Sequence, residues 1–405
     1  MSSSKRVAIV GLGVVSALGM TKDEFWEGLI NGRCGIGPVD LFDTSAYRTH
    51  IGAQVKGLDP LKHFSGKKLK RMSRCDQLGL IAAREAVADS GLGLAWLDME
   101  RVGVCLGGGA GGMLSGEKYR RDLEFKKVKP HPSLLIPFSQ SVTTDYVAHE
   151  FGCEGPRATV VTACSSSSTS VGYAADWIKN GDADIVITGG SDAMCELTYS
   201  GFNSLRAVDE NPCRPFDANR KGLSLGEGAG ILVLEDMERA KARGARIYAE
   251  FAGYGIAGDA YHMTAPEGSG DGAARTIAAA LEDAGISPDE VDYVNAHGTA
   301  TRFNDVAEAA AIKKVFGGRV GSIPVSSIKS MIGHCLGSAG GLEAVATALS
   351  IFYDIIPPTI NHEATDPHCG IDCVPNQTRR QSVRVAISNS LAFGGNNTTI
   401  VMRKN

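Results

Sequence analysis

The chain has 405 residues, too many for one ordinary domain of roughly 100–200 residues and suitable for two. Hydrophobic residues make up 43% and charged residues 21%, a globular balance that excludes a disordered, fibrous or coiled-coil protein. The formal net charge of -4 gives no reason to expect nucleic acid or an anionic membrane as a partner. Glycine is abundant, with 50 residues, which indicates many close backbone approaches.

The first apolar stretch and the cysteines indicate in which cellular compartment the protein is expected. Residues 7–20 follow two basic residues, as in a secretory signal, but three glycines and the lack of a small-x-small cleavage site favour a buried strand and turn. No other apolar run approaches the ~20 residues of a membrane span. The ten cysteines form no repeating framework, which favours a reducing cytoplasm. A possible metal cluster is formed by His362, His368, Cys369 and Cys373. No further ligand motif completes a tetrahedral site, so we expect a loop without metal there.

Short runs rich in β-branched residues alternate with longer helical patterns along the chain. This alternation predicts an α/β fold with its sheet covered on both faces, and the length fits two sheets. The expected strands are 6–10, 102–106, 159–162, 185–188, 230–234, 293–296, 325–327, 383–387 and 398–402.

A weak internal repeat in the order of elements indicates two related halves. In each half a run of small residues opens a helix, predicted over 171–179 and 342–353, and a return strand follows the helix. The charged segment 235–246 is the expected joint, with a new strand from Ile247. We therefore divide the chain into 1–250, with a cysteine discussed next, and 251–405, with two histidines.

Cys164 lies in the sequence TVVTACSSSS, where a β-branched strand ends sharply and a helix begins through small residues. A helix N-terminus offers unpaired N–H groups and a positive dipole end, which stabilise a thiolate and lower its pKa. The same N–H groups can hold an oxyanion when the thiolate attacks a carbonyl. On its own, the pattern also fits a buried small residue beside a flexible stretch.

Two histidines stand in glycine-flanked turns after predicted strands. His297 lies in NAHGTAT, and His334 ends the segment SSIKSMIGH, which also contains Lys329. Such turns project side chains and let neighbours approach closely. Taken separately, each histidine could be structural and the lysine could be a solvated charge.

The four motifs TACSSSS, NAHGTAT, KSMIGHCLGSAGG and NSLAFGGNN, in this order, resemble those of the β-ketoacyl-acyl-carrier-protein synthases. The resemblance covers essentially the whole chain and is closest to the elongating type II condensing enzymes of bacterial fatty acid synthesis. It implies the thiolase-like, five-layered α-β-α-β-α fold built from two duplicated halves. It also implies a decarboxylative Claisen condensation of an acyl group with malonyl-acyl-carrier protein, without a cofactor.

The resemblance assigns roles to residues at matching positions. Cys164 would be the nucleophile, His297 and His334 the decarboxylation pair, and Lys329 a supporting charge that acts with Glu343. The backbone N–H groups of Cys164 and Phe393 would form the oxyanion hole of the acyl group. The remaining matches concern substrate: Thr299 and Thr301 for the pantetheine arm, Asp305 and Glu308 as an acidic pair close to the site, and Phe393, Gly394 and Gly395 as a gate over the acyl pocket.

Some residues depart from the family pattern. Leu391 and Ala392 replace a phenylalanine and a glycine, Asn396 replaces a threonine, and an Arg302-Phe303 pair replaces one that begins with proline. These departures leave the mobility of the gate and the chain-length preference open.

The resemblance also implies a partner, an acidic acyl carrier protein, and a basic docking patch near the entrance. It further implies a cytoplasmic homodimer. Two alternatives remain: a ketosynthase of a secondary polyketide or polyene pathway, and a non-catalytic chain-length partner subunit, against which the three reactive side chains argue. Residues proposed for docking are Lys67, Lys68, Lys70, Arg71 and Arg206.

Overall fold

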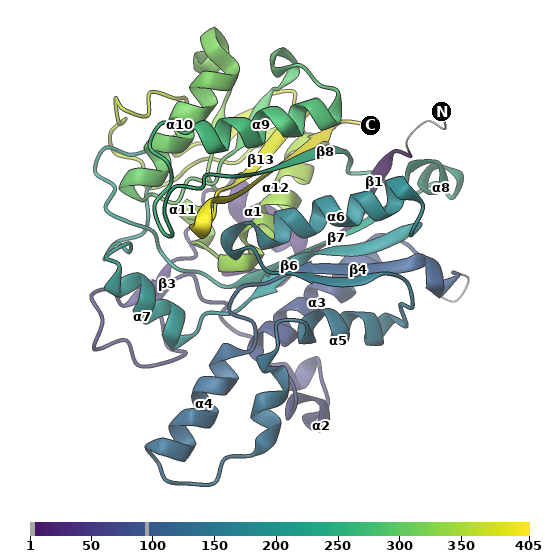
Figure 1. Cartoon of the computed structure of the whole chain (residues 1–405), viewed down its shortest axis with the longest axis vertical. Coiled ribbons are helices and arrows are strands. Elements are labelled where there is room, and N and C mark those ends of the chain that lie inside the picture. Colours follow the sequence, from purple (N-terminus) through teal and green to yellow (C-terminus); the bar gives the residue numbers. More distant parts are fainter. Residues whose placement is uncertain (1–4, 94–96) are drawn as a thin grey trace.

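The computed structural model describes residues 5–93 and 97–405. Within these residues the strands form a large mixed sheet whose order runs β10-β9-β13-β14-β8-β1-β7-β6-β4-β5 (Figure 1). Its first five strands in the chain are β1 (Val7–Val15), β4 (Val102–Gly107), β5 (Arg157–Val160), β6 (Ile185–Asp192) and β7 (Gly228–Asp236). The other five are β8 (Ala249–Gly258), β9 (Tyr293–Asn295), β10 (Val325–Ser326), β13 (Val385–Ser390) and β14 (Asn396–Arg403). The nine expected strands are all present, at slightly different bounds.

The sheet consists of two halves with the same topology. From each outer edge inward, the order is the third, second, fourth, fifth and first strand of that half. The halves join where β1 pairs with β8 over three residue pairs, so the backbone forms one continuous sheet where we expected two. The boundary at 250/251 falls inside β8, which begins at Ala249.

The helices form three layers around the two half-sheets. α3 (Arg74–Asp89) and α5 (Val142–Phe151) cover the outer face of the first half, and α9 (Asp271–Ala284) with α10 (Arg302–Phe316) covers the second. Between the halves lie α6 (Ser166–Asn180) and α12 (Ala339–Tyr353), which pack on each other and on both half-sheets. The predicted five-layered, thiolase-like α-β-α-β-α fold is therefore confirmed.

The two central helices cross closely because their first turns carry small residues. A methyl group added at Gly340 would lie 2.0 Å from Ser168 Oγ, so only glycine allows this approach. The hydroxyls of Ser168 and Thr169 bond to those of Ser390 and Thr398 in the second half, at 2.7 and 2.8 Å. The serine run is therefore a buried helix–helix interface and not a flexible stretch.

One stretch, Leu336–Tyr353, is long and apolar enough to cross a membrane by composition, and 89% of it is buried inside the protein. It contains α12, the central core helix.

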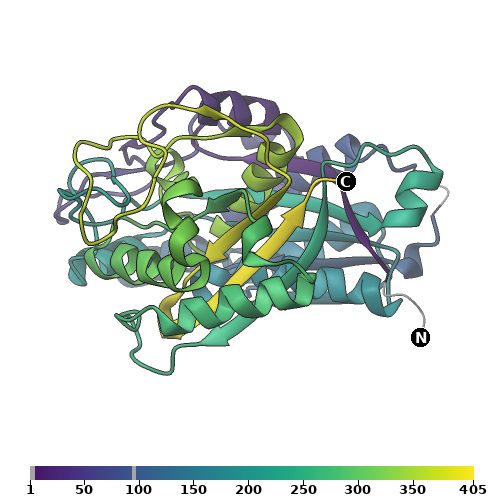
Figure 2. The same cartoon turned by 90° about the horizontal axis from the view of Figure 1, so that it is seen from above.

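The two ends of the described chain bind one common side chain. Arg6, just before β1, and Arg403, the last residue of β14, both bond to the buried Glu250 of β8. β1 and β14 lie on either side of β8 in the sheet (Figures 1 and 2).

Smaller elements surround this core. α1 (Lys22–Ile30) and α8 (Met237–Ala242) flank β1, while α4 (Met113–Glu124) and α2 (Gly66–Leu69) lie at one end of the molecule (Figure 1). α7 (Glu196–Ser204) and α11 (Lys329–Ile332) carry side chains of the site described below. Two short strand pairs complete the fold: β2 (Gly37–Pro38) with β3 (Ile51–Gly52), and β11 (Ile355–Ile356) with β12 (Arg379–Arg380).

Candidate active site

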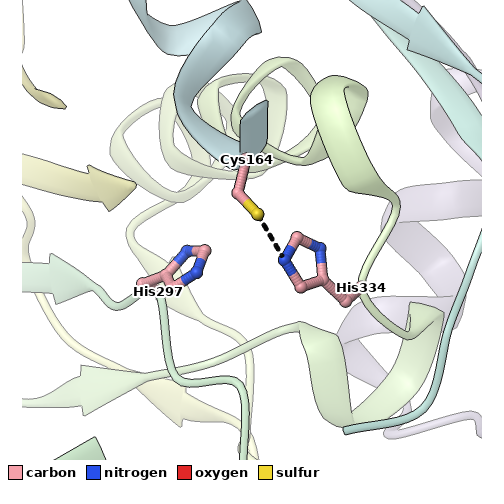
Figure 3. Close-up of side chains that lie close together, drawn as sticks. All are labelled: Cys164, His297 and His334. Atoms are coloured by element: carbon pink, nitrogen blue, oxygen red, sulfur yellow. Dashed lines mark hydrogen bonds between the residues drawn. The ribbon is translucent and has the colours of Figure 1, made fainter. Parts of the chain in front are cut away.

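Cys164 occupies the turn between β5 and α6, as the sequence predicts. The β-branched strand ends at Val160, Ala163 adopts a positive φ of 55°, and Cys164 follows in a short 3-10 turn before α6 begins at Ser166. A positive φ is unfavourable for alanine, so tertiary contacts must hold this sharp turn. The turn directs the sulfur toward the two histidines of the second half (Figure 3).

The expectation of a lowered pKa for Cys164 is wrong. Burial raises the pKa of Cys164 to about 11, because the charged thiolate loses water. The charge of Lys329 and the backbone N–H groups of Phe393 and Cys164 lower this pKa, but less than burial raises it. The predicted N–H groups thus act on the sulfur, while the thiol stays protonated at neutral pH.

His334 contacts the sulfur directly, with 3.1 Å between Nε2 and Sγ. Its other ring nitrogen, Nδ1, faces the backbone N–H of Leu336 at 3.2 Å. Because a backbone N–H can only donate, Nδ1 must accept, and the proton of the neutral ring is on Nε2. His334 therefore presents an N–H donor to the space above Cys164.

His297 lies beside His334, with ring centroids 5.3 Å apart and planes nearly perpendicular at 88°. Lys329 Nζ lies 3.3 Å from its Nδ1, so this nitrogen accepts from the ammonium and the proton is on Nε2. Burial and the charge of Lys329 hold the pKa of both imidazoles well below 6.5. Both rings are therefore neutral N–H donors.

Cys164, His297 and His334 offer ligand atoms that all lie within 4.8 Å of one another. A metal ion bound there would need a lone pair on each Nε2, which the partners of the Nδ1 atoms assign to a proton. Two converging N–H donors suit a carbonyl oxygen or oxyanion instead. The geometry thus fits thioester chemistry better than metal binding.

Lys329 and Glu343 form a fully buried ion pair behind His297. Glu343 projects from α12, and burial raises its pKa to about 7 while Lys329 opposes that rise. Burial and the ammonium of Lys329 keep both imidazoles neutral, while Glu343 binds that ammonium behind His297. The supporting roles expected for Lys329 and Glu343 stay predictions.

Asp305 and Glu308 are near the site but do not line its cavity. Glu308 accepts from the backbone N–H groups of His297 and Gly298, both at 2.8 Å, and Asp305 accepts from that of Ala300 at 3.1 Å. Both carboxylates are fully buried. The interpretation of this pair as substrate-binding therefore needs correction, because the two side chains hold the His297 turn in place.

A cavity of about 450 Å³ opens from the three reactive side chains to the surface. Thr299 and Thr301 line it, with hydroxyls 2.9 Å apart, as expected for residues along an extended arm. Phe393 stacks on Phe202 of α7 at 5.6 Å between centroids, and both rings line the cavity next to Cys164. Phe202 had no sequence signal, since α7 lies far from every motif.

The segment predicted to form a gate bends at two glycines. Gly394 and Gly395 have positive φ values of 77° and 69°, which suit glycine. The Gly394 N–H donates to the Met263 carbonyl oxygen at 2.8 Å, and Leu391 and Ala392 lie on the cavity wall. Four of the residues that depart from the family pattern therefore line the cavity, namely Arg302, Phe303, Leu391 and Ala392, whereas Asn396 does not.

The candidate docking residues are not gathered in one place. Arg206 lines the cavity mouth, whereas Lys67 and Lys68 lie on α2, which Figure 1 shows well apart from α7, and Lys70 and Arg71 follow it. Lys68 is also paired with Glu150. The mouth is also lined by exposed cations that were not proposed for docking from the sequence: Arg48, Lys221 and Arg302.

Comparisons with known proteins agree with this arrangement. Residues 4–240 match the family model "Beta-ketoacyl synthase, N-terminal domain", and residues 248–363 match its C-terminal counterpart. A Synechocystis protein named 3-oxoacyl-[acyl-carrier-protein] synthase 2 is 43% identical, over 99% of this chain and 98% of its own. A Staphylococcus aureus protein of the same name is 42% identical, over 100% of this chain and 99% of its own.

Solved structures also align along the full chain. The ishigamide ketosynthase/chain length factor has a TM-score of 0.94 and 39% identity, with all of both chains covered. A type II polyketide ketosynthase, bound to the hexaketide and in complex with its acyl-carrier protein, has a TM-score of 0.92 and 35% identity, again over all of both chains. The chain belongs to the β-ketoacyl synthase family.

Proposed function

We propose that this chain joins an acyl group to a malonyl unit by decarboxylative Claisen condensation, in fatty acid elongation. The observation that carries this proposal is the convergence of one buried thiol and two neutral imidazole N–H donors at the end of one cavity. The full-length similarity to 3-oxoacyl-[acyl-carrier-protein] synthase 2 proteins supports the same reaction. No redox cofactor or external electron sink is needed, because the thioester carbonyl of the malonyl unit itself accepts the electron pair that decarboxylation releases.

The first step transfers the acyl group to the enzyme. Cys164 Sγ, losing its proton, attacks the thioester carbonyl, and the backbone N–H groups of Cys164 and Phe393 stabilise the oxyanion. The bond between the acyl carbon and the carrier sulfur breaks, and the carrier leaves as a thiol with that proton. The product is an acyl-Cys164 thioester at the end of the cavity.

The second step uses both histidines. The malonyl thioester oxygen accepts from Nε2–H of His297 and of His334, which stabilises the enolate formed as the carbon–carboxylate bond breaks and carbon dioxide leaves. The enolate carbon then attacks the acyl carbon on Cys164, a new carbon–carbon bond forms, and the cysteine leaves as a thiolate, which takes up one proton from solvent to restore the thiol. The β-ketoacyl chain stays on the carrier.

The substrates are proposed to arrive on an acyl carrier protein. A similar ketosynthase was solved in complex with its acyl-carrier protein, which supports this partner. Thr299 and Thr301 line the cavity where a pantetheine arm would pass, and Arg206 is one of the exposed cations at its mouth. Lys67, Lys68, Lys70 and Arg71 stay predicted docking residues.

We also propose a cytoplasmic homodimer. All ten cysteines are free, which suits a reducing compartment. β5 is an edge strand of the sheet, so its outer backbone groups are available to a second copy. The α4 region exposes several large apolar side chains, as an interface would: Leu123, Phe125, Leu135, Ile136 and Phe138.

A ketosynthase of a secondary polyketide or polyene pathway is the second candidate. The similarity to the ishigamide ketosynthase/chain length factor and the altered gate residues Leu391 and Ala392 favour it. A non-catalytic chain-length subunit would not need a thiol with two facing imidazoles, so the site argues against that role.

Intact-mass detection of adducts after offering acyl-carrier-protein thioesters of different chain length tests the proposal. We expect a mass increase equal to the acyl group, carried by Cys164 and absent from Cys164→Ala. Saturated chains accepted as a graded series support fatty acid elongation, whereas acceptance limited to polyketide or polyene chains supports the second candidate. An unchanged mass with every thioester would contradict both.

A further inference from the structure

Asp192 is a buried carboxylate that the reaction above does not use. It ends β6, is fully buried, and accepts from backbone N–H groups at Ala110 (2.9 Å), Gly111 (3.0 Å) and Gly337 (2.9 Å), with that of Ala193 close by. Burial raises its pKa to about 6, and these N–H groups oppose the rise, so the carboxylate stays ionised at neutral pH. A buried anion held by N–H groups alone calls for an explanation.

The donors belong to two loops from different halves of the molecule. Ala110 and Gly111 follow β4 in the first half, whereas Gly337 belongs to the turn 336–338 that follows His334 in the second. These loops touch, because a methyl group added at Gly337 would lie 2.4 Å from the carbonyl carbon of Gly108. Asp192 therefore fixes the turn after His334 to the sheet that leads to Cys164.

This turn determines which nitrogen of His334 carries the proton. The backbone N–H of Leu336 donates to His334 Nδ1 at 3.2 Å, and Leu336 keeps a positive φ of 52°, which is unfavourable for leucine. The peptide next along the chain donates through the Gly337 N–H to Asp192 Oδ2. The carboxylate thus holds the peptide that follows Leu336, directly next to the peptide whose N–H points at the imidazole.

We propose that Asp192 is a positioning residue for His334: by holding the Leu336-Gly337 turn, it keeps Leu336 N–H on Nδ1 and the imidazole proton on Nε2. This inference rests on the proposed function, because decarboxylation is the step that needs the Nε2–H donor. The proton position itself is a property of the free protein and can be measured without any substrate.

The first measurement is the histidine NMR spectrum of the unaltered protein with labelled histidine. The His334 signal is identified by its loss in His334→Ala, and the ring carbon and nitrogen shifts distinguish the two neutral forms. We expect the proton on Nε2. A proton on Nδ1 would overturn the proposal, because Leu336 N–H could not then donate to that nitrogen.

The second measurement compares Asp192→Asn with Asp76→Asn. The amide of asparagine has one acceptor oxygen and turns an NH₂ toward backbone donors, so the Leu336-Gly337 turn loosens. The control residue Asp76 is also a buried carboxylate of the first half, but its partners are Ser73 and Thr143. Both variants are followed by carbon dioxide release from malonyl-carrier thioester without an acyl primer, by acyl transfer to Cys164, and by thermal unfolding.

For Asp192→Asn we expect decarboxylation to fall roughly tenfold or more relative to acyl transfer, since a misplaced donor weakens enolate stabilisation. A Nδ1–H signal from His334 should appear, whereas Asp76→Asn should keep both the rate ratio and the spectrum. An unchanged ratio with an unchanged His334 signal would overturn the proposal. Should Asp192→Asn not fold, Gly337→Ala displaces the same turn and carries the same two expectations.

Failure of the proposed function has a different signature. If the unaltered protein releases no carbon dioxide from malonyl thioesters, the condensation proposal fails. The His334 spectra of the unaltered protein, Asp192→Asn and Gly337→Ala still decide whether Asp192 controls the proton position.

Discussion

At the scale of single residues, the site depends on where protons are when no substrate is bound. Cys164 carries its proton because burial outweighs the stabilising groups around it, and each imidazole carries one on Nε2 because its Nδ1 accepts from a neighbour. Acyl transfer therefore begins from a thiol, and decarboxylation from two neutral donors. Each assignment leads to a measurable pH dependence.

The pKa of Cys164, raised to about 11, predicts slow and pH-dependent alkylation. The thiolate is the reactive form and its fraction rises about tenfold per pH unit below the pKa, so labelling by iodoacetamide should accelerate steadily from pH 6 to 10. Rates are read by peptide mass at Cys164, in a Cys34→Ser background that removes an exposed thiol. A plateau near pH 7 would show a lowered pKa and contradict this picture.

Removal of either imidazole should suppress decarboxylation. Each supplies one donor to the developing enolate, so His297→Ala or His334→Ala should slow carbon dioxide release by roughly 10²–10³-fold. In the unaltered protein the pKa of both rings lies well below 6.5, so protonation of histidine should cause no rate change between pH 7 and 9. An undiminished rate in either variant would exclude that ring as a donor.

At the scale of elements, the central helix pair determines how the two halves align. α6 begins with the residues that follow Cys164, and α12 carries Glu343. The crossing of these two helices therefore determines where Cys164 lies relative to the ion pair behind His297. Small side chains at the crossing permit the close approach. A larger side chain at this crossing should therefore affect both the stability of the protein and the geometry of the active site.

Gly340→Ala places a methyl group against Ser168 and should lower the free energy of unfolding by about 1–3 kcal/mol, measured by urea denaturation. Gly201→Ala is the matched control, because Gly201 lies in helix α7 with open space around it. The control should be neutral or slightly stabilising, since alanine favours helix. Equal stability of the two variants would mean that the crossing tolerates bulk.

The sequence predicts the strands well and the starts of the central helices poorly. Strands such as 185–188 are apolar and β-branched, so local pattern defines them. The helices begin at Ser166 and Ala339, before the predicted 171 and 342, because burial against another helix makes serine and glycine helical there. Burial by segments distant in sequence cannot be seen in a local pattern. For this reason the sequence-based predictions of the pKa of Cys164 and of the role of Glu308 were wrong.

At the scale of the whole molecule, the charge around the cavity mouth determines how an acidic carrier would approach. Arg48, Arg206, Lys221 and Arg302 line that mouth, while the chain as a whole has a net charge of -4. Arg48 is paired with Glu210, so Arg206, Lys221 and Arg302 are the cations best suited to steering a negative partner toward this opening.

Charge reversal at the mouth should therefore weaken carrier-dependent activity. Arg206→Glu should raise the KM for acyl-carrier-protein substrates several-fold at low salt, with a smaller effect at high salt because ions screen exposed charges. The same KM measured for Lys67→Glu, on the distant α2, tests whether the other predicted docking residues contribute to carrier binding. A KM that Arg206→Glu leaves unchanged would remove Arg206 from the docking surface.

The short pairing between β1 and β8 has a consequence for how the protein loses activity. The sulfur comes from one half and both imidazoles from the other, and the contacts that keep them in register include the three residue pairs between β1 and β8 and the two crossing helices. A slip of one half against the other by an ångström would separate the reacting atoms while nearly all secondary structure persisted. Turnover should then disappear earlier than the circular dichroism signal during gradual denaturation.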